Sequence, residues 1–169
     1  MSYNKYLPSI LTGFGAAVLS TIPGIKNLNC CLIIPAAAFL AIFLHSKATG
    51  NNSPIKLNKA LSYGLITGLI AAFFSSLFDI IITFITHSND LVVGLAQTEE
   101  MMQELKLGKL IDASLEIMHK MVAEIKETGF SPLYMVMITI SNFFIFSIFG
   151  MLGGLLGMAA LNKKNRPRV

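Results

Sequence analysis

Long apolar runs alternate with short polar connections along most of the chain. Crossing a bilayer takes about 20 apolar residues of helix, so the two longer runs can cross unaided and the first two are short. The pattern predicts an all-α, polytopic membrane protein with four transmembrane helices in a single membrane domain, residues 1–169. The predicted spans are about 7–25, 28–44, 59–86 and 132–161. For the first two runs, a re-entrant hairpin that returns without crossing is the alternative.

Proline and glycine mark several of the predicted helix ends. Pro8 suits the first turn of the first span and Gly24 suits its end, whereas Pro35 either kinks the second span or marks a late start. The polar stretch 45–58 predicts a loop with turn chemistry, and the stretch 162–169 predicts a basic tail.

Residues 89–128 have a different character, with eight acidic residues and four lysines around a regular apolar stripe. The stripe recurs at spacings of three and four, which places its members on one helical face. The segment therefore predicts an extramembrane amphipathic helix between the third and fourth spans, with Gly108 as a point where it can divide into two pieces. The residues of the stripe are Ile111, Leu115, Met118, Val122 and Ile125.

The apolar stripe is expected to be a partner-docking face. A helix that lies on a membrane usually has a basic polar face, whereas the polar face here is mainly acidic and would be repelled by anionic headgroups. Docking onto another protein or onto a second copy fits better, with lying on the membrane and packing within the chain as the alternatives.

Composition supports the membrane interpretation. The chain is 54% hydrophobic and 13% charged, whereas soluble domains carry about 25% charged residues. The formal net charge of +4 comes from basic residues beside apolar runs, which indicates contacts with membrane lipid and no nucleic acid. Four spans place eight Lys and Arg on the side of both termini and five on the other. The positive-inside rule therefore predicts cytoplasmic termini in a cell membrane.

Glycines four residues apart let helix backbones approach closely in lipid. We interpret these glycines as helix-packing positions, either within one chain or between copies. They are Gly64, Gly68, Gly150, Gly153, Gly154 and Gly157.

Asp79 is the single acidic residue inside a predicted span. Because a charge within a bilayer is costly, it is a candidate intramembrane polar site. A proton or ion role, an interhelical hydrogen bond and an interfacial carboxylate are the three interpretations.

No motif in the sequence indicates catalysis, so we expect no enzyme activity, no catalytic residue, no cofactor and no metal site. Glu116 and His119 have a spacing used in di-iron bundles, but those need two such pairs and further glutamates. His87 with Asp90 offers too few ligands for a zinc site. The adjacent Cys30 and Cys31 are read as small apolar residues at a helix start.

Three short pieces resemble uncharacterised small bacterial four-span inner-membrane proteins, a family of unknown function. They are Ile22-Pro23, Asn29-Cys30-Cys31 and the glycine-rich 63–68. The resemblance implies the architecture and a bacterial inner membrane, and it transfers no functional residue.

These observations favour a non-enzymatic accessory or scaffold subunit of a membrane protein assembly. We expect it to bind a protein partner or to form a homo-oligomer. The alternative is a small oligomeric transporter or channel that uses Asp79.

Overall fold

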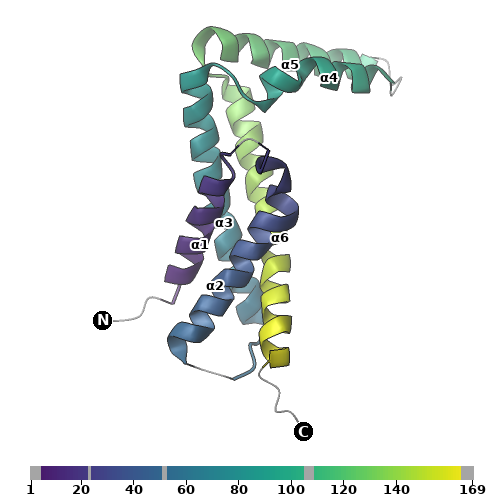
Figure 1. The fold of residues 1–169 in the computed structure, drawn as a ribbon. Helices are drawn as coiled ribbons and strands as arrows, with labels where there is room; N and C mark the ends of the chain where they lie inside the picture. The colour runs from purple at the N-terminus through teal and green to yellow at the C-terminus, as the bar shows by residue number, and fades with distance from the viewer. Residues whose placement is uncertain (1–4, 23, 51–52, 105–108, 165–169) are drawn as a thin grey trace. The chain divides into compact units, whose positions relative to one another are not determined.

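The chain forms two structural units in a computed structural model that describes residues 5–22, 24–50, 53–104 and 109–164 (Figure 1). Unit 1 comprises Met1–Ser76 with Thr139–Val169, and unit 2 comprises Leu77–Ile138. Every regular element within the described ranges is helical, which confirms the all-α prediction.

Unit 1 is a bundle in which helices that follow one another along the chain alternate in direction. α1 lies against α2, and Ser20 just after α1 is hydrogen-bonded to Asn29 just before α2, so these helices are antiparallel. Its helices are α1 (Leu7–Leu19), the 3₁₀ turn η1 (Lys26–Leu28), the π turn η2 (Asn29–Ile33), α2 (Ile34–Thr49) and the adjoining parts of α3 (Leu57–Thr86) and α6 (Pro132–Lys164).

α1 runs in the same direction as α3, because contacts advance together along both helices. The Ser9 hydroxyl lies 3.5 Å from the Tyr63 carbonyl oxygen, and further along the Phe14 and Phe74 rings meet edge to face at 5.0 Å. The start of α1, the end of α2, the start of α3 and the end of α6 therefore lie at one end of unit 1 (Figure 1).

The second predicted span continues further than expected. α2 ends at Thr49 where the sequence analysis places an end near residue 44, and Gly50 follows in the left-handed conformation with φ of 59°. Hydropathy marks where a helix leaves an apolar environment. The helix itself continues until a residue can adopt the left-handed conformation, which glycine does without strain. Likewise, α6 includes Asn162 and Lys163 of the predicted tail, and 165–169 lie outside the described residues.

The π turn has a local cause in Pro35. Proline has no N–H and its ring would clash with the carbonyl oxygen four residues earlier, here that of Cys31. The wider turn of η2 just before Pro35 relieves this clash. The start of the second span is thus a bent entry, and Cys31 on it is a free, exposed thiol.

Unit 2 holds the acidic segment as two helices, α4 (Asp90–Glu104) and α5 (Lys109–Thr128), which pack on each other. The predicted break at Gly108 lies outside the described residues. α5 ends at Gly129, whose φ is 73° and whose Cβ position would overlap the backbone of Phe84. Both the backbone conformation and the space require glycine there.

Three helices are long and apolar enough to cross a membrane among the residues described: Cys31–Thr49, Leu57–Thr86 and Pro132–Lys163. The shorter Leu7–Leu19 is also apolar. Large apolar side chains face outward on the long helices, with Phe73 at 54% and Phe144 at 69% exposure. A helical bundle with such an exterior is compatible with a multi-pass membrane protein, because lipid takes the place of water around it.

Candidate functional site

α3 and α6 approach each other at glycines. A Cβ at any of four positions would overlap backbone atoms of the facing helix, and Gly64 and Gly150 lie directly opposite each other. The absence of side chains is therefore what allows the two backbones to touch. The four positions are Gly64, Gly68, Gly150 and Gly154.

A second face of α6 contacts α2. A Cβ at Gly153 would overlap the backbone of Pro35, whereas one at Gly157 would make ordinary contacts of 3.4 to 3.5 Å with Phe39 and Ile42. The glycine-rich run of α6 thus packs on two helices of its own chain.

A polar pair that sequence reasoning missed also joins α3 and α6. The Asn142 side-chain amide donates to the Ser76 hydroxyl at 3.0 Å, inside two predominantly apolar helices. The signal for it was the asparagine in the middle of the fourth apolar run, since an amide there needs a partner.

Asp79 lies on the part of α3 that belongs to unit 2, and its side chain is half-buried. One helical turn further along, Thr83 is only 1% exposed. The position fits any of the three interpretations of Asp79 given by the sequence.

The apolar stripe of α5 is largely covered by the chain itself. Ile111, Val122 and Ile125 are buried, and Leu115 and Met118 are half-buried. Packing within the chain, one of the alternatives given by the sequence, therefore accounts for the buried members of the stripe, and docking of a partner on this face stays a prediction.

The outer surface of α4 and α5 is acidic. Six carboxylates are exposed there: Asp90, Glu100, Glu104, Asp112, Glu116 and Glu127. His119 contacts Glu99 of the neighbouring helix α4, a pair that the same-helix spacing to Glu116 did not indicate.

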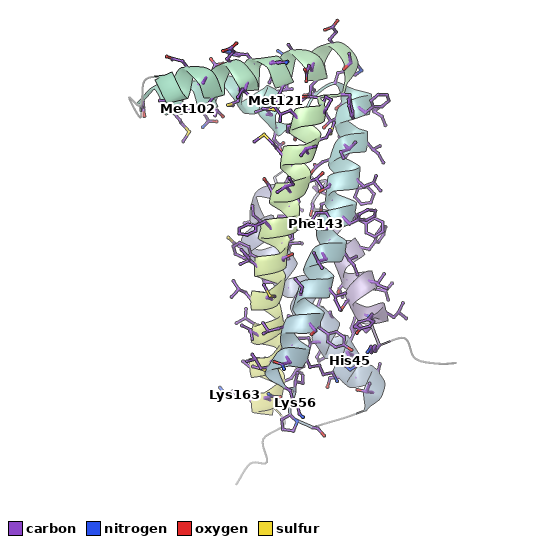
Figure 2. The ribbon with its side chains drawn as sticks, turned by 180° about the vertical axis from the view of Figure 1, so that it is seen from behind. His45, Lys56, Met102, Met121, Phe143 and Lys163 are labelled. Carbon is purple, nitrogen blue, oxygen red and sulfur yellow. The ribbon has the colours of Figure 1, made fainter. Side chains whose placement is uncertain are left out.

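A cavity of about 240 Å³ lies at the end of unit 1 where α2 ends and α3 begins. Figure 2 labels His45 and Lys56 at this end, with Lys163 of α6 nearby. The sequence pattern predicted a polar loop here but gave no sign of the cavity. The lining residues are Ile42, His45, Ser46, Thr49, Ser53, Pro54, Ile55, Lys56, Lys59 and Tyr63.

His45 and Tyr63 form the inner wall of the cavity and are 7% and 5% exposed. The Tyr63 hydroxyl donates to the Lys5 carbonyl oxygen at 3.0 Å, so it accepts from the His45 ring, whose Nδ1 lies 2.9 Å away. The outer wall is tied to α6, because the Asn162 side chain accepts from the Ile55 N–H at 2.7 Å and donates to the Ile55 carbonyl at 3.1 Å. The cavity is thus lined by α2, the loop after it and the start of α3, and hydrogen bonds tie its walls to Lys5 and to α6.

Charge is segregated between the two units. All nine Asp and Glu residues fall between Asp79 and Glu127, inside unit 2. Unit 1 contains nine Lys and Arg and no Asp or Glu at all. The lysines around the cavity therefore have no side-chain carboxylate of unit 1 to neutralise them.

Comparison with known proteins gives one match. No curated protein and no solved structure matches the chain. Residues 5–159, which cover most of the sequence, match the family described as protein of unknown function (DUF4199), and the chain therefore belongs to this family.

Proposed function

We propose that the chain is a non-enzymatic, multi-pass protein of the bacterial inner membrane that serves as an accessory or scaffold subunit of a membrane protein assembly. The observation that carries this proposal is the exposed acidic surface of α4 and α5. It is the part of the chain whose chemistry suits neither lipid tails nor anionic headgroups.

The proposed topology has four membrane segments, α1, α2, α3 and α6, with both termini in the cytoplasm. The alternating directions of consecutive helices in unit 1 and the lysines at its shared end support this orientation. α1 has 13 residues and is about 20 Å long, so it ends below the opposite surface. The last carbonyl groups of α1 have partners within the protein, because Val18 and Leu19 accept from the N–H groups of Thr21 and Ile22 at 3.1 and 3.3 Å.

A protein partner with a basic surface fits α4 and α5 best. Opposite charges across an interface favour association and set its orientation. Exposed apolar side chains stand among the carboxylates and supply contact area, with Val93 at 79%, Met101 at 62% and Ile117 at 48% exposure.

The test is gentle-detergent purification of the tagged full chain, followed by mass spectrometry of the intact complex. We expect a stoichiometric foreign partner that is lost from a variant with Glu100→Gln, Asp112→Asn and Glu116→Gln. A control variant with Lys120→Gln and Lys126→Gln changes charge on the same surface and should retain the partner.

Retention of the partner by the acidic variant, or absence of any foreign partner, contradicts the proposal. A homo-oligomer without a partner favours the transporter or channel alternative, and Asp79→Asn is then the variant to examine for lost transport.

A further inference from the structure

We propose that the cavity at the end of unit 1 is a binding site for the phosphate group of an anionic ligand. The shared chemistry is a phosphate that two lysines and a serine hydroxyl can hold, supplied by a phospholipid headgroup or by a soluble phosphate. This inference does not depend on the accessory role, because it concerns a different unit of the chain.

The positive charge around the cavity favours binding of an anion that is not part of the chain. Lys56 and Lys59 line it, and no Asp or Glu occurs anywhere in unit 1. Ammonium groups that gather without a carboxylate repel one another, and a bound phosphate relieves this repulsion. Lysine binds phosphate as a point charge with three donors.

The remaining lining is suited to hydrogen bonds with phosphate oxygens. Ser46 lines the cavity from the last turns of α2 and has a hydroxyl group, whereas the Thr49 hydroxyl already donates to the His45 carbonyl oxygen at 2.9 Å. α3 begins at Leu57, between the two lysines, and the start of a helix carries partial positive charge. The two full positive charges of the lysines, with the start of α3, exceed the partial negative charge at the end of α2, which also lines the cavity.

The inner wall is fixed before any ligand arrives. His45 and Tyr63 are buried and bonded to each other and to the Lys5 carbonyl. Asn162 holds the loop at Ile55 through two hydrogen bonds. A wall that is already ordered loses little freedom on binding, which favours affinity.

The volume of the cavity and its position at the end of the helices favour a ligand of the size of a lipid headgroup. The volume of about 240 Å³ lies below the range of about 300–1,000 Å³ that is typical of pockets for larger organic molecules. The cavity sits at the end of helices long enough to cross a bilayer, where basic pockets between helices meet anionic headgroups.

The experiment measures binding to the purified full chain in detergent, with phosphatidylglycerol, phosphatidylcholine and inorganic phosphate as separate probes. Retention of each lipid is followed by native mass spectrometry, and binding of inorganic phosphate by the shift in melting midpoint relative to chloride at equal ionic strength. The test variant is Lys56→Gln with Lys59→Gln. The control is Lys47→Gln with Lys163→Gln, which removes two exposed lysines from the same end outside the cavity lining.

We expect the test variant to bind the anionic probe about 20 to 30 times more weakly, at about fivefold per lysine, and the control to lose less than threefold. Phosphatidylglycerol binding without a response to inorganic phosphate assigns the headgroup as the source, and the reverse assigns a soluble phosphate. Equal losses in both variants, equal retention of phosphatidylcholine, or no binding of either anionic probe overturns the proposal.

Discussion

Replacing Gly64 by alanine tests the contact between α3 and α6 directly. The Cβ of the new residue would overlap the Gly150 carbonyl, which is backbone and cannot swing aside as the tip of a side chain can. The two helices must therefore separate at this point or bend.

The expected cost follows from that separation. A shift of about 1 Å forfeits a quarter to a half of the attraction between facing atoms, and overpacking of this kind costs about 1–3 kcal/mol. Alanine recovers up to about 1 kcal/mol because it favours helix over glycine. We therefore expect a net loss of about 1–2 kcal/mol, which for a chain of this size lowers the melting midpoint by about 2–8 °C.

The assay is thermal melting of a fluorescent fusion in mild detergent, read as the fraction that stays monodisperse on size exclusion. Gly157→Ala is the matched control on α6, because its Cβ would make only ordinary contacts, and its midpoint should stay the same or rise. A double variant, Gly64→Ala with Gly150→Ala, should cost less than the sum, since one separation accommodates both methyl groups. Equal midpoints for Gly64→Ala and Gly157→Ala, or strict additivity in the double variant, would refute the reasoning.

Three further predictions concern side-chain contacts. Asn162→Ala should lower the free energy of unfolding by about 1–3 kcal/mol and weaken binding at the cavity, because both hydrogen bonds to Ile55 are lost; unchanged melting and binding would contradict this. Asn142→Ala should cost about 0.6–2 kcal/mol, the range for interhelical hydrogen bonds in membranes, and Asn142→Ser is the control that retains a polar group. His119→Ala should leave the melting midpoint within error, because its contact with Glu99 is solvent-exposed and exposed pairs contribute little; a loss of several degrees would show that the contact matters.

Periodic features of the fold were predictable from sequence. Apolar runs longer than the bilayer core indicated the long helices, and Gly129 followed by Pro132 indicated where α5 ends and α6 begins. Small residues four apart indicated positions of close backbone approach, and the structure places Gly64 and Gly150 in such an approach. Each of these signals lies within a short stretch of sequence. Each reflects a physical requirement that does not depend on which distant segment packs there.

Features that depend on a distant partner were not predictable. The spacing of the α5 stripe requires that one face be covered, but it is silent about whether the chain or another molecule covers it. His119 could pair with a residue on its own helix or on the next, and only the packing of α4 against α5 selects Glu99. The cavity was missed because its wall joins a basic loop to Lys5 and Asn162, which lie far away in the sequence.

The hydrogen bonds between Asn162 and Ile55 also set an order of events during biosynthesis. The two residues are 107 positions apart, and at about 5–20 residues per second the ribosome needs about 5–20 s to bridge that interval. During this time the loop between α2 and α3 exists without its hydrogen bonds to Asn162, and Gly64 is not yet covered by α6. If α3 spans the membrane as proposed, a chain truncated before α6 would leave the glycine face of α3 uncovered in the bilayer, open to quality-control proteases or to an α6 supplied in trans.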